Sequence, residues 1–335
     1  MLIYVLAYKL FRKEVFKIAE LNQINRQGEP MIKKKSSLNS RIYQYRYLYL
    51  LTIPGLIYIL IFKFVPMWGL LLAFKEYNFY TGILGSKWVG LKHFTDLFAD
   101  PFFLIMLRNT IVINMLSLIL FFPLPIIISL MLNEVRRAPF KRIMQSIIYL
   151  PHFLSWVVIV SLTFFMLSSN VGLVNKLLVT MNFQPVSFLT EKKFFWLLIV
   201  FQNIWKETGW GTILFLAAIA GIDVQLYEAA VMDGASRMKQ IWHITLPSIR
   251  PTIVILLILR LGAIFDVGFE QVLLMANPLV RDVAEVFDTY AFTQGIQNGQ
   301  MSLGIAVGFF KSLVGLTFVL SANYLAKKIG DEGIY

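Results

Sequence analysis

A polar run near the middle of the chain has the residue types of a docking element. It begins with Glu228 and two alanines, passes through Asp233 and Gly234, and ends at Leu246 and Pro247. A carboxylate such as Glu228 can accept a charge-assisted hydrogen bond from an arginine of another protein. Glycine adopts a positive φ without steric cost, and a residue before proline avoids the α region. The run predicts two short helices joined at Gly234, the second ending at Leu246 and Pro247, although an ordinary interhelical loop is an alternative interpretation.

The chain lacks the residues of the common catalytic and metal sites. It has no cysteine, and its three histidines (His93, His152 and His243) have no paired-ligand spacing. No GxxxxGK[ST] run is present that could cradle the phosphates of ATP. We therefore predict that the chain has no catalytic residue, holds no metal, binds no cofactor of its own and is not an enzyme.

Several polar and aromatic residues lie within apolar stretches. Charged groups are costly there and indicate either a solute pathway or a structural ion pair. Arg260 is predicted near the middle of one helix, with Asp266 and Glu270 on a shared face nearer its outer end, and both interpretations stay open for all three. Trp205 and Trp210 could stack on saccharide rings, but tryptophan also forms belts at membrane interfaces. The candidate pathway residues are Gln202, Asn203, Trp205, Trp210, Arg260, Asp266 and Glu270.

The elements that must position these residues are membrane-spanning helices. Hydrophobic residues make up 58% of the 335 residues and charged residues 15%, whereas soluble domains average about 25% charged residues. A helix that crosses a membrane needs about 20 mostly apolar residues. Gly304 and Gly308 open the last apolar stretch at a spacing that permits close helix contact. We predict an all-α, polytopic membrane protein with six transmembrane helices, at residues 47–74, 103–133, 143–167, 194–220, 251–276 and 301–326.

The distribution of positive charge predicts the orientation. Ten lysines and arginines lie in residues 1–46, and further ones follow the second and fourth spans. The positive-inside rule then puts both termini and the docking run in the cytoplasm. The net charge of +12 reflects topology and contact with anionic lipid, so we predict no nucleic-acid partner. The predicted organisation is a basic cytoplasmic arm (1–46), a six-helix transmembrane domain (47–326) with a cytoplasmic loop at about 221–250, and a cytoplasmic tail (327–335).

With Trp242, the IxLP residues at 244–247 and Pro251, the polar run resembles the EAA loop of permease subunits of binding-protein-dependent ABC importers. From about residue 42 onward the chain is similar to carbohydrate permeases of the maltose-type superfamily, in the branch that imports oligosaccharides derived from polysaccharides. Runs that carry this similarity are 88–94, 268–271, 288–290 and 306–312. The resemblance implies a type I ABC-importer permease fold. It also implies that the residues coupling the chain to an ATPase are Glu228, Ala229, Ala230, Asp233, Gly234, Ala235, Ile244, Leu246 and Pro247.

The resemblance further implies a role and a set of partners. The chain would be one permease of a heterodimer in a bacterial cell membrane, taking an oligosaccharide from an extracellular or lipoprotein solute-binding protein and passing it inward by alternating access. Two ATPase subunits would use ATP and Mg²⁺ and would act through the EAA loop. An ion-gradient-driven secondary sugar transporter is the alternative, but such a transporter needs no docking loop. The identity, length and charge of the oligosaccharide stay open, as does the choice between a heterodimer and a homodimer.

Overall fold

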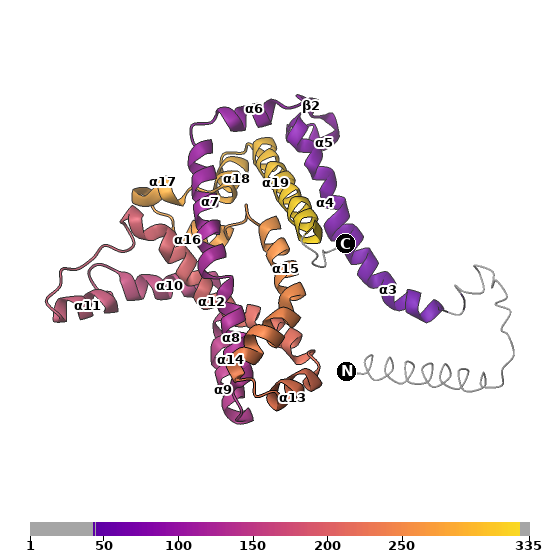
Figure 1. Ribbon diagram of the computed structural model, residues 1–335. Helices are drawn as coiled ribbons and strands as arrows, with labels where there is room; N and C mark the ends of the chain where they lie inside the picture. Colours follow the sequence, from indigo (N-terminus) through magenta and orange to yellow (C-terminus); the bar gives the residue numbers. More distant parts are fainter. Residues whose placement is uncertain (1–42, 44, 329–335) are drawn as a thin grey trace. The chain divides into compact units, whose positions relative to one another are not determined.

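The computed structural model describes residue 43 and residues 45–328. Most of the predicted arm at 1–46 and of the predicted tail at 327–335 lies outside the described residues, so their placement in the cytoplasm stays a prediction. Helices account for most of the described chain, with one antiparallel pair of two-residue strands (Figure 1). The elements in order are α3 (Arg46–Ile59), η2 (Leu60–Phe64), α4 (Val65–Met67), η3 (Trp68–Phe74), β1 (Lys75–Glu76), α5 (Gly82–Gly85), β2 (Lys87–Trp88), α6 (Lys92–Ala99), α7 (Phe103–Leu120), α8 (Pro123–Glu134), α9 (Ala138–Tyr149), η4 (Leu150–Phe153), α10 (Trp156–Leu167), α11 (Leu173–Thr180), α12 (Lys192–Ala220), α13 (Val224–Met232), α14 (Arg237–Gln240), η5 (Ile241–Thr245), α15 (Leu246–Gly262), α16 (Phe269–Met275), η6 (Pro278–Val280), α17 (Arg281–Ala284), α18 (Phe287–Phe292), η7 (Thr293–Gln297) and α19 (Met301–Lys328).

The chain divides into two compact units after Val65. In the first unit, every side chain of α3 and η2 is exposed, although nearly all of these residues are apolar. A helix that is apolar on all sides is typical of a membrane span, because lipid rather than water then surrounds it. The first predicted span therefore begins in α3.

The described residues contain four helical runs that are long and apolar enough to cross a membrane. Two bent pairs of helices raise this number to six if each pair counts as one span. The prediction of a six-span helical membrane protein is confirmed in this form, in which two of the spans include sharp bends. The four runs are Arg46–Phe74, Phe103–Glu134, Arg237–Gly262 and Met301–Lys328, and the pairs are Ala138–Phe153 with Trp156–Leu167, bent by 99°, and Lys192–Ala220 with Val224–Met232, bent by 70°.

The predicted bounds of the fifth span were wrong at both ends. The helical run begins at Arg237, because a π-helical turn (η5) carries the chain from α14 into α15. Leu246 and Pro247 therefore begin α15 and do not end the helix before it. Pro247 lies in the first turn of α15, a position where proline is tolerated although it has no N–H.

The fifth span ends at Gly262, where the prediction extended it to residue 276. An irregular link follows, and Gly268, at φ 92°, begins the separate helix α16. Arg260 thus lies in the last turn of α15, Asp266 lies in the link and Glu270 lies in α16. The prediction that Asp266 and Glu270 share one face of the helix that carries Arg260 is wrong, because hydropathy cannot locate a break between two apolar segments.

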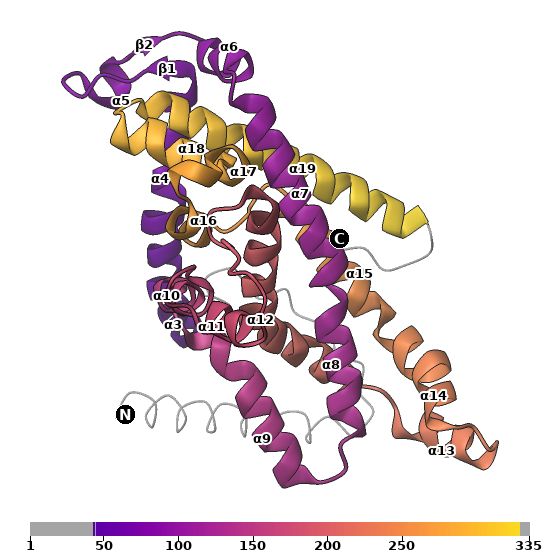
Figure 2. The same cartoon turned by 90° about the vertical axis from the view of Figure 1, so that its left-hand side faces the viewer.

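Within the second unit, α13 and α14 lie at the same end as the junction of α8 and α9 (Figures 1 and 2). The opposite end holds α6, α17 and α18, and the α7–α8 run extends between the two ends (Figure 2). This arrangement puts the positively charged loop after α8 beside the predicted docking run, as the positive-inside prediction requires.

Glycines mark where the helices approach most closely. A Cβ atom at Gly315 would lie 2.5 Å from the carbonyl oxygen of Gly262, so α15 and α19 touch through their backbones. A Cβ at Gly304 would lie 2.8 Å from the carbonyl oxygen of Ala291, whereas a Cβ at Gly308 would meet nothing within 4 Å. Of the predicted pair, Gly304 makes a close contact within the chain and Gly308 does not. Small residues permit such approach between membrane helices.

The buried apolar residues form three clusters. One lies between α7, α10 and α12 and the segment 267–286, around Phe195 and Ile199. A second surrounds Phe287 and Phe265, and a third joins α12 to α15 around Phe215. The first two clusters fix the segment between α15 and α19 against the long helices, and thereby position the polar residues described below.

Candidate functional site

The predicted docking run forms a helix, a tight corner and a second short helix. Asp223 caps the first turn of α13 by accepting a hydrogen bond from the Gln225 N–H at 3.0 Å. At the other end the Ala235 N–H bonds the Ala230 carbonyl at 2.8 Å and the Gly234 N–H bonds the Val231 carbonyl at 3.0 Å. These two bonds, with Gly234 at φ 72°, make a Schellman cap. The predicted corner at Gly234 is therefore confirmed, and its cause is the positive φ.

Side chains tie this corner to two long helices. Arg237, at the start of α14, pairs with Glu134 at the end of α8, with 2.7 Å between Nη1 and Oε2. The Tyr227 hydroxyl lies 2.9 Å from Oγ1 of Thr245, which connects α13 to η5. These contacts connect the corner to the end of α8 and to η5, which leads into α15. The sequence could not reveal the first of these links, because its partners are far apart along the chain.

A groove with a volume of about 810 Å³ lies beside α13. Glu228 lines it together with Tyr227 and residues of α8, α12 and η5. Around this end the large apolar side chains are exposed, including Met232 at 86% and Trp242 at 63%. An exposed apolar surface outside the lipid is typical of a protein interface. The groove and these side chains are therefore suited to a protein partner.

Farther along the long helices lies a smaller cavity, the membrane cavity, with a volume of about 380 Å³. It brings together four of the seven predicted pathway residues: Asn203, Trp210, Arg260 and Asp266. Ser117 and Phe121, next to the break between α7 and α8, also line the cavity and were not predicted as pathway residues. The other lining residues are Ile113, Asn114, Ser117, Phe121, Trp156, Ile199, Glu207, Gly211, Val267 and Gly268.

The three remaining candidates lie elsewhere. Gln202 is buried and bonds the Thr163 hydroxyl at 2.7 Å, and its side-chain oxygen accepts a bond from Gln271 at 2.8 Å. It therefore links α12 to α10 and α16. Trp205 is 48% exposed and Glu270 is exposed, and neither lines the membrane cavity. For these three residues the geometry favours structural or surface roles.

The bend between η4 and α10 borders the membrane cavity. The buried Lys206 donates to the carbonyl oxygens of His152 at 2.7 Å and Leu154 at 2.5 Å, and so caps the end of η4. His152 stacks on Trp210 with 4.5 Å between ring centroids, and its Nδ1 lies 2.9 Å from the Glu207 carboxylate. Consecutive residues of α12 thus fix both the bend and one wall of the cavity.

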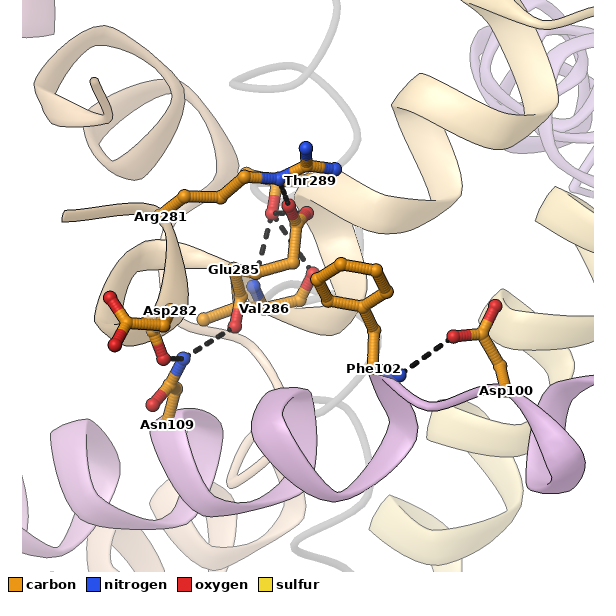
Figure 3. Close-up of polar contacts among 8 residues, drawn as sticks. All are labelled: Asp100, Phe102, Asn109, Arg281, Asp282, Glu285, Val286 and Thr289. Atoms are coloured by element: carbon orange, nitrogen blue, oxygen red, sulfur yellow. Dashed lines mark hydrogen bonds and ion pairs between the residues drawn. The ribbon is translucent and has the colours of Figure 1, made fainter. Parts of the chain in front are cut away.

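At the other end of the long helices, main-chain carbonyls anchor the segment around α17 (Figure 3). The buried Asn109 of α7 donates to the carbonyl oxygens of Asp282 at 3.1 Å and Glu285 at 2.9 Å. Trp196 of α12 donates to the Val283 carbonyl at 2.9 Å. Side chains complete the anchor: Thr289 donates to Glu285 at 2.9 Å, and Arg281 lies 3.4 Å from the same carboxylate (Figure 3).

Two ionisable groups at this end are shifted by their surroundings. Burial, and then the hydrogen bond from its hydroxyl to Asp100, raise the pKa of Tyr290. A hydrogen bond from Lys192 lowers the pKa of the exposed Asp282. Tyr290 therefore stays protonated and donates to Asp100, which in turn accepts the Phe102 N–H at 2.7 Å (Figure 3).

Asn109 provides a direct test of this anchor. Asn109→Asp keeps the shape but replaces the amide donor with an acceptor, which removes its bonds to both carbonyl groups and leaves the Asp282 carbonyl with the Arg108 donor alone. We expect it to destabilise the segment by about 1–3 kcal/mol. Hydrogen exchange of the amides at 282–289 in the purified complex should become faster. Asn298→Asp, at an exposed position, is the control, and unchanged exchange in Asn109→Asp would contradict the assignment.

Known proteins place these features in a family. A family model described as "Binding-protein-dependent transport system inner membrane component" matches residues 121–331. The polygalacturonan/rhamnogalacturonan transport system permease protein YteP of Bacillus subtilis (strain 168) is 53% identical over 302 residues, which is 90% of this chain and 94% of YteP. Protein LplB of the same organism is 53% identical over 290 residues, which is 87% of this chain and 91% of LplB.

The fold has solved counterparts. A chain in the crystal structure of a bacterial alginate ABC transporter, in complex with an alginate pentasaccharide-bound periplasmic protein, superposes with a TM-score of 0.80 and 39% identity, over 89% of this chain and 99% of that chain. The predicted type I importer permease fold is thereby confirmed. The chain therefore belongs to the family of binding-protein-dependent transport system inner membrane components, as a multi-pass cell-membrane permease of a carbohydrate ABC importer.

Proposed function

We propose that this chain is one of two permease subunits in an ATP-driven importer of acidic oligosaccharides. It receives the saccharide from a solute-binding protein outside the cell and releases it into the cytoplasm by alternating access. Two partner ATPases bind ATP and Mg²⁺, and this chain binds neither. Similarity to YteP and to the alginate transporter supports an acidic cargo, because the polysaccharides in their names contain uronic acids.

The coupling geometry carries this proposal. The Schellman cap makes a compact corner between α13 and α14, and the ends of this unit continue into α12 and α15. Glu228 is exposed and can accept a bond from an arginine in a groove of the ATPase, and Ala229 and Ala230 allow close approach. Asp233, Gly234 and Ala235 form the corner, and Ile244, Leu246 and Pro247 begin the helix that moves with it.

The coupling works as a shift between two conformations. Closure of the ATPases on ATP displaces α13, and the contacts from Arg237 to Glu134 and from Tyr227 to Thr245 carry this displacement into α8 and α15. For transport to follow, ATP and the loaded binding protein must both bind the outward-facing state more tightly than the inward-facing one. The second permease completes the pathway, and we propose a different chain for it, as the resemblance to carbohydrate permeases implies.

Reconstitution tests the function. Liposomes that contain this chain, its partner permease and the two ATPases are expected to take up trigalacturonate only when ATP and the binding protein are both present. A mutation that disables the ATPase serves as control, because uptake should then fall to the level without ATP. Uptake that an ion gradient drives without ATP would contradict the proposal and would support a secondary transporter.

A further inference from the structure

The membrane cavity contains three charged side chains, and two of them are already paired. The Glu207 carboxylate lies 2.9 Å from Nδ1 of His152. The Asp266 carboxylate lies 2.6 Å from Nζ of Lys311, a buried lysine of α19 that also pairs with Asp288 of α18. Both acidic groups of the cavity therefore have a partner outside it.

The third charged residue, Arg260, has no such partner. Among the described residues, no hydrogen bond or ion pair within 4 Å reaches its guanidinium, which lies over the Phe121 ring at 5.6 Å from the centroid. Glu207 and Asp266 attract it over a longer distance. Charged groups at membrane depth are costly, and they are retained where they pair or where they contact a solute. Arg260 is half-buried in the cavity wall, so the forked donors of its guanidinium are available to an anion.

The rest of the lining fits a saccharide. Asn203 and Ser117 provide amide and hydroxyl groups, and Trp156 and Trp210 provide aromatic rings. A volume of about 380 Å³ lies near the lower end of the roughly 300–1,000 Å³ usual for small-molecule sites. Such a cavity holds a short stretch of a chain of sugars and not a whole polysaccharide. Arginine matches a carboxylate through two parallel hydrogen bonds, which lysine cannot reproduce.

We propose that the membrane cavity is a passage site for uronic acid residues and that Arg260 recognises their carboxylate. This inference rests on the proposed function. Glu207 and Asp266 attract the guanidinium of Arg260 while the cavity is empty. As the saccharide passes, a sugar carboxylate accepts hydrogen bonds from the guanidinium N–H groups. The pairing of Glu207 with His152 and of Asp266 with Lys311 keeps these two carboxylates from repelling the anionic substrate at full strength. The cavity therefore selects for acidic over neutral saccharides.

The test compares two probes in liposomes that contain the full complex, ATP and the binding protein: trigalacturonate and its uncharged trimethyl ester. Arg260→Gln is expected to lower uptake of trigalacturonate about tenfold, the loss expected for a charge-assisted hydrogen-bond pair. Uptake of the ester should fall much less. Arg260→Lys keeps the positive charge but loses the two parallel N–H donors, and it should lower trigalacturonate uptake by no more than about threefold. Lys176→Gln, which removes an exposed positive charge on α11 away from the cavity, should behave like the wild type.

In the uptake assay, three results would overturn the proposal: unchanged uptake in Arg260→Gln, equal losses of the two probes, or equal losses in Arg260→Gln and Arg260→Lys. Copurification with the partner subunits shows whether each variant assembles. Loss of assembly in both variants indicates a structural role for Arg260 and also overturns the proposal. If only Arg260→Gln fails to assemble, the uptake of the two probes by Arg260→Lys decides. A wild-type complex that takes up neither probe would contradict the proposed function itself, so the two failures are distinguishable.

Discussion

Substitution of Gly234 by valine is expected to lower ATP-coupled uptake about tenfold or more while the protein still inserts into the membrane. Gly234 has φ 72°, a region that costs other residues about 1–2 kcal/mol and that β-branched residues rarely adopt. The strain would open the Schellman cap and change the angle between α13 and α14. Glu228 would then be displaced from the position in which the ATPase binds it. Uptake by reconstituted complexes, together with the amount of this chain in membranes, measures the effect.

Gly234→Asn is the matched control. A Cβ at this position would meet nothing within 4 Å, so backbone conformation and not crowding decides the outcome. Asparagine tolerates the left-handed region better than other residues with a side chain, and it should keep most of the uptake. Equal uptake by the wild type and Gly234→Val would remove the corner from the coupling mechanism. Equal loss in the two variants would mean that the side chain itself interferes with the partner.

Substitution of Gly209 by alanine is expected to have the largest effect on stability. A Cβ at Gly209 would lie 2.1 Å from the Ile148 carbonyl oxygen, so α12 and α9 must separate. The added methyl group should cost about 1–3 kcal/mol, and more if the backbone cannot shift. Lys206, three residues earlier on α12, would lose its position on the carbonyl groups of the η4–α10 bend. We expect the apparent Tm of the purified complex to fall by about 5 °C or more.

Gly308→Ala is the matched control, because it adds the same methyl group at a position where no other atom is close. Gly308 lies within α19 and nothing lies within 4 Å of its Cβ position, so the added methyl group should leave stability unchanged or slightly higher. Equal apparent Tm values for Gly209→Ala and the wild type would show that α12 and α9 can separate without cost. A large fall in Gly308→Ala would instead indicate that Gly308 contacts a partner subunit.

The docking corner could be predicted because its signal is local. A glycine after a short helix, followed by a serine and a second helical stretch, predicts a C-terminal helix cap, because all the residues that form this cap are close in sequence. The approximate number of spans was also predictable, because hydropathy reports directly on contact with lipid. The ends of the fifth span were not predictable. Pro247 lies in the first turn of α15 and does not end the helical run, and an apolar sequence continued past the true end at Gly262.

The pathway residues show where sequence reasoning stops. Polar character marked Asn203 and Arg260, which line the membrane cavity, but it equally marked Gln202, which is buried in a hydrogen-bond network. The difference depends on which side of α12 faces α10 and α16, and that depends on contacts between distant segments. The same is true of Lys311, whose partners Asp266 and Asp288 come from different elements.

The anchor of the segment 281–289 has a consequence for how the family diversifies. Asn109 and Trp196 bind main-chain carbonyl groups, which are the same whatever side chain a residue carries. The half-exposed side chain of Asp282 can therefore change without breaking these carbonyl bonds, whereas Val283 belongs to the buried core. Side chains of this segment that face outward can diverge between relatives while the buried scaffold stays unaltered.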